Sequence, residues 1–317
     1  MKKSITITLL CLMGLATAAL AFFFIRQSLT NREIEREWGE IPAVVPELKS
    51  TSHLEIVPLY EEAGATDDLI IGHGVSYLIR TDAATILMDV GHNPDQLEVA
   101  PFSQNMYRLG IDWEEIDRIV ISHPHPDHVG GVTAWQENTV SFGELPGGLG
   151  ERLVFVPSDM AFEGAVHTTI PTLPGPDIAT TGVISYPEVF PLSLFEPRGR
   201  EQALVVHVAN EGLVLITGCG HPTMEKLVER AEALYGQPVV GVVGGLHYES
   251  TPLEEVQPHI DFLLPLSLRL VALSPHDSSP QALEAFKAAF PGAYQDLQVG
   301  TAIRFPVNSE SAQENED

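Results

Sequence analysis

Apolar residues along the chain gather in short runs that are separated by turns rich in glycine, proline, asparagine and aspartate. Runs of this kind between turn signals predict buried strands. We expect strands over residues 54–60, 75–80, 85–90, 116–121, 153–156, 203–208, 213–217, 239–243, 269–273 and 301–307. Helical patterns predict helices over residues 96–109 with an interruption near Pro101, 127–135, 222–235 and 281–290. The chain is therefore expected to contain both strands and helices, as α/β and α+β folds do.

The N-terminal segment has a different pattern. Lys2 and Lys3 precede an apolar run from Ile5 to Ile25, and about 20 apolar residues are enough for a helix to cross a bilayer. The run continues beyond the small residues 16–18, which favours an uncleaved signal anchor over a cleaved signal peptide. Basic residues on the two sides nearly balance. We expect a single-pass membrane protein with the N-terminus inside and the catalytic domain on the extracytoplasmic side.

This pattern divides the chain into four parts. Residues 1–25 form the membrane anchor, and the polar residues 26–50, which contain prolines, form a linker. Residues 51–307 form the catalytic domain, and the acidic residues 308–317 form a disordered tail. Within the domain, residues 168–197 are rich in proline, glycine and threonine without a clear period. They are either a lid over the site or an irregular connection.

The composition of the chain argues against some classes of function. A chain of 317 residues with 44% hydrophobic residues can form one large core. Only 17 Lys and Arg stand against 43 Asp and Glu, for a net charge of −26, so a phosphate-tracking surface and a nucleic-acid partner are not expected. A small-molecule substrate is expected instead. Cys11 and Cys219 lie in unlike segments, so no disulfide framework is predicted, and the oligomeric state is open.

One stretch, residues 121–131, carries the candidate chemistry. His123, His125 and Asp127 alternate after an apolar run and project the same way in an extended backbone, whereas His128 breaks the alternation. This arrangement suits two neighbouring metal ions, one held by His123 and His125 and the other by Asp127 and His128. Imidazole and carboxylate suit zinc, and also iron or manganese. The alternative is a solvated loop that happens to contain histidines.

The pattern His-x-His-x-Asp-His after a strand resembles the metallo-β-lactamase superfamily. The resemblance implies a four-layer αββα sandwich with a one- or two-metal site at its edge. It further implies that Asp89, at the end of an early strand, supports the metal-binding histidines. His221 would be the third ligand of the metal at His123 and His125, and His276 would complete the second site.

Four segments are similar to one branch of this superfamily, namely residues 72–76, 217–221, 244–247 and 275–276. This is the branch of the archaeal 7,8-dihydropterin-6-methyl-4-(β-D-ribofuranosyl)aminobenzene-5′-phosphate synthase, and the resemblance covers roughly residues 53–305. Cys219 stands where hydrolases of the superfamily carry a bridging aspartate. It either binds metal as a thiolate or is a small buried residue. Residues 197–201 lack the histidine that many members carry there, so His221 would replace it.

The main hypothesis is a metal-dependent hydrolase with two divalent ions, zinc being preferred, that uses a metal-bound hydroxide. Its substrate would be a small ester, lactone, thioester, amide or phosphoester. Asp127 would hold the second metal and orient the hydroxide, while His247 and His73 would bind substrate or act as acid. Two alternatives remain: a pterin-linked transferase that acts on a diphosphate-activated substrate, and a non-catalytic metal-binding sensor domain.

Overall fold

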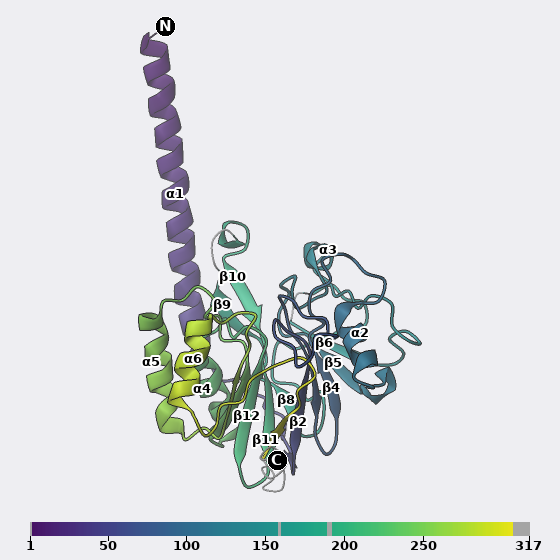
Figure 1. Ribbon diagram of the computed structural model, residues 1–317. Coiled ribbons are helices and arrows are strands. Elements are labelled where there is room, and N and C mark those ends of the chain that lie inside the picture. The colour runs from purple at the N-terminus through teal and green to yellow at the C-terminus, as the bar shows by residue number, and fades with distance from the viewer. Residues whose placement is uncertain (1, 158–159, 189–191, 307–317) are drawn as a thin grey trace. The chain divides into compact units, whose positions relative to one another are not determined.

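The computed structural model describes residues 2–157, 160–188 and 192–306 (Figure 1). The chain divides into two compact units. The smaller unit consists of residues 1–40 and 184–200, and the larger unit consists of residues 41–183 and 201–317. The acidic tail predicted at 308–317 lies outside the described residues.

The larger unit contains two β-sheets. The first has the order β1-β11-β12-β13-β14, with β8 also paired to β11. Its strands are β1 (Ser50–Thr51), β8 (Ile178–Thr180), β11 (Leu204–Val208), β12 (Gly212–Thr217), β13 (Val239–Gly244) and β14 (Leu270–Leu273). β12, β13 and β14 are mutually parallel and buried along their whole length, as is typical of parallel strands that are covered on both faces.

The second sheet has the order β15-β2-β3-β4-β5-β6-β7. Its strands are β2 (Leu54–Tyr60), β3 (Ser76–Arg80), β4 (Thr85–Met88), β5 (Arg118–Val120), β6 (Leu153–Val156), β7 (Val166–His167) and β15 (Ile303–Phe305). The pairs from β15 to β4 are antiparallel, and those from β4 to β7 are parallel. β4 and β5 therefore end at the same edge of the sheet.

The side chains of the strands alternate between two apolar layers, as the pleat of a strand requires. Ile56, Tyr77 and Ile86 of the second sheet pack with Val206 and Ile216 of the first, in the core between the sheets. The neighbouring positions on the second sheet face the other way and pack in a separate cluster beneath the residues of α2. The sandwich is thus held together by apolar burial on both sides of this sheet.

Helices cover the outer faces of the two sheets (Figure 1). The first sheet carries α4 (Met224–Tyr235), α5 (Leu253–Leu263) and α6 (Pro280–Ala289), and the second carries α2 (Pro101–Arg108) and α3 (Val132–Gln136). The short 3₁₀ helices are η1 (Trp113–Glu115), η2 (Leu192–Leu194) and η3 (Leu264–Leu266). The layers are αββα, so the predicted fold class is confirmed.

Two predictions within the domain need correction. The helix expected over residues 127–135 begins only at Val132, because Gly130 and Gly131 have φ values of 89° and 121°, which lie outside the helical range. Residues 126–130 form turns instead. The segment 168–197, expected to be one lid or irregular loop, contains the buried strand β8 and then enters the smaller unit.

The smaller unit consists of helix α1 (Lys2–Trp38) and a hairpin of β9 (Ile184–Pro187) and β10 (Arg198–Glu201). The Trp38 indole N–H donates to the backbone oxygen of Ser185 at 2.8 Å. Arg198 binds Glu37 at 2.7 Å and Glu33 at 2.8 Å. Helix α1 includes residues 26–38. The first part of the segment predicted as a linker is therefore helical.

Among the described residues, one helix is long and apolar enough to cross a membrane. It covers Leu10–Trp38, with a mean hydropathy of 1.7 in its most apolar window, and none of that window is buried. A signal sequence near the N-terminus has the same length and composition.

Candidate metal centre

The candidate ligands follow strands that end at one edge of the sandwich. Because parallel strands direct their carboxyl ends to the same edge, residues from distant parts of the sequence meet there. After β5 come His123, His125, Asp127 and His128; after β12 come Cys219 and His221; after β13 comes His247, and after β14 comes His276. All the metal ligands that the sequence predicts therefore lie on loops at this edge.

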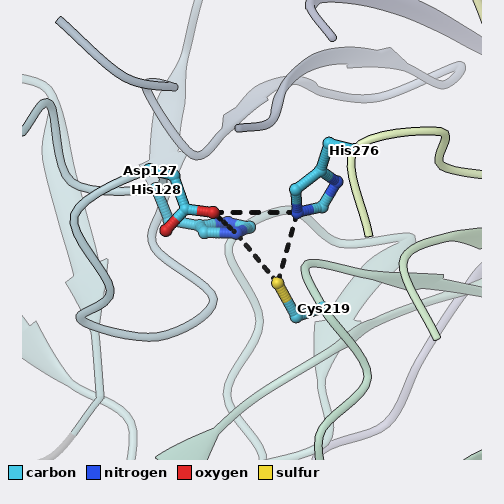
Figure 2. A group of neighbouring side chains, drawn as sticks. All are labelled: Asp127, His128, Cys219 and His276. Carbon is cyan, nitrogen blue, oxygen red and sulfur yellow. Dashed lines mark hydrogen bonds and ion pairs between the residues drawn. The ribbon is translucent and has the colours of Figure 1, made fainter. Parts of the chain in front are cut away.

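Four of these residues, which we call the inner cluster, surround one point (Figure 2). They are Asp127, His128, Cys219 and His276, whose ligand atoms all lie within 4.8 Å of one another. The Cys219 sulfur lies 3.1 Å from Nε2 of His128 and 3.3 Å from Nε2 of His276. Oδ2 of Asp127 lies 3.5 Å from the first of these nitrogens and 3.8 Å from the second.

A second group, which we call the outer cluster, adjoins the first. It consists of His123, His125 and His221, whose rings lie 4.6–4.9 Å apart between centroids. Nε2 of His123 lies 3.1 Å from Nδ1 of His125. The ligand atoms of His123 and His221 also lie within 4.8 Å of the Cys219 sulfur. Cys219 therefore stands between the two clusters.

On the far side of the rings, Asp89 and Ser122 hold two histidines. Asp89 Oδ2 lies 2.7 Å from Nδ1 of His128 and accepts the Ser122 hydroxyl at 2.6 Å. The same hydroxyl lies 2.9 Å from Nδ1 of His123. Asp89 is fully buried and has a φ of 57°, a backbone conformation that aspartate tolerates better than most residues. Because Nδ1 of each ring has an outer partner, Nε2 of each ring faces the centre.

His276 is supported in a similar way by residues that the sequence did not single out. Its Nδ1 lies 2.5 Å from the hydroxyl of Ser274, and that hydroxyl also donates to the carboxylate of Glu61. Glu61 is fully buried and accepts a second hydrogen bond from Tyr77 at 2.7 Å. Burial raises the pKa of Glu61 to about 7. A hydrogen-bonded series of carboxylate, serine hydroxyl and histidine ring thus lies on each side of the centre.

The electrostatics of the inner cluster favour a cation. Burial lowers the pKa of His128, but the interactions of its ring with Cys219, Asp127 and Asp89 outweigh burial and hold that pKa well above its ordinary value. Burial raises the pKa of Asp127, but His128 outweighs burial and the net pKa lies below the ordinary range, so this carboxylate is ionised. The groups that stabilise a proton on His128 would equally stabilise a metal ion placed between them.

Without a metal ion, the buried side chains of His123, His276 and Cys219 are neutral. Burial, and then the charge of His128, lowers the pKa of His123 and of His276 well below the ordinary value. Neutral imidazole is the form that binds a metal. Burial raises the pKa of the Cys219 thiol well above its ordinary value. A thiolate at this position therefore requires a nearby positive charge, which a divalent cation supplies.

The loop that carries Cys219 and His221 is fixed by a buried carboxylate that the sequence did not single out. Glu201 accepts the backbone N–H groups of Cys219 at 3.1 Å, Gly220 at 2.9 Å and His221 at 2.8 Å. Glu201 lies in the region where many relatives were expected to carry a histidine. This chain therefore uses the position to hold the loop rather than to supply a ligand itself.

The next residue, Gln202, holds the other ligand loop. Its side-chain amide donates to the backbone oxygen of Ile121 at 2.7 Å, and its backbone N–H donates to that of Ser122 at 2.9 Å. Gly218 allows the two loops to approach closely, because a Cβ at this residue would overlap the Ser122 hydroxyl. Glu201, the last residue of β10, and Gln202, which follows it, thus connect both halves of the centre.

Two histidines lie at the rim. His73 is half exposed, with Nδ1 3.0 Å from Glu62 and Nε2 3.5 Å from Asp127. His247 is exposed, has a φ of 59°, and its ring centroid lies 4.4 Å from that of His221. Its backbone N–H donates to the buried Asp277 at 2.9 Å. Both side chains are thus placed to contact a molecule bound at the centre.

The residues present fit a metal site. Imidazole nitrogens, one sulfur and one carboxylate oxygen converge, and the opposite nitrogens of three rings are held by hydroxyl or carboxylate groups. Partners of this kind fix the tautomer of a histidine that binds a metal. Nitrogen and sulfur donors with one carboxylate match the preference of zinc.

Comparison with known proteins gives consistent results. A family model of the metallo-β-lactamase superfamily matches residues 70–140. The 7,8-dihydropterin-6-methyl-4-(β-D-ribofuranosyl)-aminobenzene-5′-phosphate synthase of Methanocaldococcus jannaschii is 25% identical over 294 residues, which cover 80% of this chain and 97% of the synthase. An uncharacterised protein of the same archaeon is 26% identical over 194 residues, or 55% of this chain and 72% of that protein.

A solved structure shares the fold. The crystal structure of Tm1679, described as a metal-dependent hydrolase of the β-lactamase superfamily, aligns with a TM-score of 0.56 at 21% identity and covers 79% of this chain and 98% of that one. The predicted resemblance to the metallo-β-lactamase superfamily, and to the branch of the archaeal synthase, is confirmed.

Proposed function

We propose that this chain is a metal-dependent hydrolase with two divalent metal ions, zinc being preferred, that acts on a small ester, lactone, thioester, amide or phosphoester. The convergence of ring nitrogens on the Cys219 sulfur and the Asp127 carboxylate supports this proposal most strongly. The outer cluster would hold one ion and the inner cluster the other. Divalent ions at these positions would lower the pKa of bound water and polarise an oxygen of the substrate.

The protein residues would have separate roles in hydrolysis. The contacts of Asp127 with the described histidines involve Oδ2, so Oδ1 is able to accept a hydrogen from the attacking water and orient it. His247, exposed beside His221, would donate a proton to the leaving group. His73, between Glu62 and Asp127, would bind a polar group of the substrate.

A second candidate is a transferase that acts on a diphosphate-activated, pterin-linked substrate. The similarity to the archaeal synthase favours it, because the alignment covers almost the whole of that enzyme. The same centre would serve this reaction, since divalent ions neutralise the charge of a leaving diphosphate. Release of diphosphate distinguishes this candidate from a hydrolase.

The apolar helix supports a proposal about location. We propose that residues 1–25 remain attached as a single-pass anchor, that residues 39–50 connect it to the catalytic domain, and that the domain faces the extracytoplasmic side. The apolar part of α1 is unburied in the structure, so a bilayer is the environment that would cover it. The acidic composition gives no support to a nucleic-acid partner.

Metal content and turnover of the full chain, purified in detergent without chelators, test the proposal. We expect about two equivalents of zinc per chain, as in two-metal hydrolases, and a loss of metal in His123→Ala and Cys219→Ala. His167→Ala is the matched control, because this exposed histidine of β7 lies outside the clusters. Turnover is measured with ester, lactone, thioester, amide and phosphoester substrates.

The outcomes separate the candidates. Metal-dependent turnover that is lost in His123→Ala and kept in His167→Ala supports the hydrolase. Diphosphate release without hydrolysis of any simple substrate supports the transferase. Bound metal that stabilises folding without turnover points to the sensor domain considered from the sequence. Full metal content in His123→Ala would overturn the metal centre itself.

A further inference from the structure

The sequence that connects β9 to β10 is unusually apolar. Residues 189–195 read Val-Phe-Pro-Leu-Ser-Leu-Phe, with a glutamate on each side. Within its described part, the side chain of Phe195 is 84% exposed and that of Leu194 is 45% exposed. We call Leu192–Phe195 the hairpin tip. Neighbouring exposed apolar side chains of this kind commonly mark a surface that contacts a partner or a membrane.

Hydrogen bonds attach the hairpin tip to α1 at Arg26. The guanidinium of Arg26 donates to the backbone oxygens of Ser193 at 2.5 Å and Leu194 at 2.9 Å. Arg26 is the first charged residue after the apolar run that ends at Ile25. The tip is therefore level with the end of the apolar part of the helix.

The base of the hairpin is attached further along the same helix. Trp38 bonds to Ser185 at 2.8 Å, and Arg198 bonds to Glu37 at 2.7 Å. Residues 26–38 of the helix span roughly 18 Å, at about 1.5 Å per residue. The hairpin thus runs along the polar part of α1, from its C-terminal end up to the level where the apolar part begins.

We propose that the hairpin tip is a second membrane contact, which inserts Leu194 and Phe195 into the interfacial layer of the bilayer that α1 crosses. The inference rests on the proposed membrane anchor. The free energy falls when leucine and phenylalanine side chains move from water to this depth. The guanidinium of Arg26 can reach the lipid headgroups. Glu196, exposed directly after the tip, limits the depth of insertion, because a carboxylate is costly to bury in lipid.

The contact has a consequence for the smaller unit. A single helix can tilt and rotate in a bilayer, and neighbouring packed elements and interfacial anchors restrict that freedom. A tip that touches the same bilayer beside α1 provides such a restriction. Helix and hairpin then act as one support with two points of attachment to the membrane.

Fluorescence quenching of the full chain in phosphatidylcholine vesicles tests this contact. A single cysteine for an environment-sensitive fluorophore is introduced as Phe195→Cys, in a Cys11→Ser background that keeps the buried Cys219. The background protein without a new cysteine measures any labelling of Cys219. Quenching is compared between vesicles with and without lipids that carry a nitroxide near the headgroup or deep in the acyl chain.

Two further labels calibrate the result. Leu15→Cys lies in the apolar run and reports the anchor itself. Glu35→Cys is exposed on α1 roughly 14 Å beyond Arg26, at about 1.5 Å per residue, and reports a position in water. We expect the shallow nitroxide to quench the Phe195 label several-fold more than the Glu35 label, and the deep nitroxide to quench the Leu15 label.

The outcomes distinguish the two proposals. If the Leu15 label is quenched and the Phe195 label behaves like the Glu35 label, the anchor stands and the second contact is refuted. If the Leu15 label is also unquenched, the anchor fails and the second contact fails with it. Self-quenching of the Phe195 label that grows with protein density, without quenching by lipid, would assign the tip to a second copy of the chain and overturn the proposal.

Discussion

Replacing Glu201 with glutamine tests how the loop of Cys219 and His221 is held. The carboxylate is fully buried and accepts three backbone N–H groups, two through Oε1 and one through Oε2. Glutamine has the same length but only one acceptor oxygen. Its NH₂ group would take the place of the other carboxylate oxygen and would face a backbone N–H. Both groups are hydrogen-bond donors, so no hydrogen bond can form between them.

The expected losses of stability and of metal affinity follow from this mismatch. A buried N–H that loses its acceptor costs about 1–3 kcal/mol, and the remaining hydrogen bonds lose the contribution of the charge. Burial also raises the pKa of Glu201, which means that the fold disfavours the charged form. Removing that charge offsets part of the loss. We therefore expect Glu201→Gln to lower the free energy of unfolding by about 1–2 kcal/mol, and metal affinity by about 10–100-fold.

Three measurements check this expectation. Chemical denaturation gives the free energy of unfolding, and competition with a chelator gives zinc affinity. Cobalt substitution gives the thiolate-to-cobalt absorption band, which reports whether Cys219 is a ligand. The matched control is Glu229→Gln, an exposed glutamate that contacts Lys226, for which we expect a change within about 0.5 kcal/mol. Lower stability with unchanged zinc affinity and an unchanged cobalt band would refute a role for Glu201 in the metal centre.

Three further perturbations test other parts of the structure. Ser274→Ala removes the hydroxyl beside Nδ1 of His276, and we expect zinc affinity to fall about 10-fold in a competition titration; unchanged affinity would contradict this. Gly245→Ala places a Cβ against a buried carboxylate oxygen and a backbone carbonyl oxygen, so denaturation should show a loss of about 1–3 kcal/mol, whereas Gly292→Ala has open space and should show none. Burial raises the pKa of Glu225, but the hydrogen bond from its histidine partner outweighs burial and the net pKa lies below 4.5. A lowered carboxylate pKa stabilises the fold above about pH 4.5, and this stability is lost as the pH falls. Glu225→Gln should therefore lose less stability than the wild type between about pH 6 and 3, and equal losses would argue against the pair.

Much of the sandwich was predictable because its strands are short apolar runs between turn residues. The strands predicted at 54–60 and 153–156 match β2 and β6 to the residue, and those predicted at 203–208 and 213–217 match β11 and β12 to within one residue. The ligands were predictable for a related reason. Each follows a strand, and strands that run parallel bring the residues after them to one edge. Their roles as ligands remain predictions.

The residues that support the ligands could not be predicted in this way. Ser274 and Glu61 are 213 positions apart in the chain, and no local pattern connects them. Glu201 looks like an ordinary strand residue, and only the fold shows that its carboxylate meets the loop after β12. The hairpin that joins α1 was also missed, because its sequence resembles a proline-rich loop and its partner lies more than 140 positions away.

The two clusters differ in their number of donors, and this difference bears on where a substrate would bind. The inner cluster offers a complete set of four protein donors, from Asp127, His128, Cys219 and His276. Zinc held by four protein ligands has no open position, whereas three protein ligands leave one for water or substrate. If the single sulfur stays with the inner cluster, the outer cluster keeps three ring nitrogens, from His123, His125 and His221. An open position would then lie beside His221, whose ring contacts the exposed His247. A bridging aspartate would serve both ions through two oxygens, whereas a thiolate would have to serve both through one sulfur atom. If Cys219 binds the inner ion alone, we expect an unequal pair of sites, with the reactive position on the side of His247.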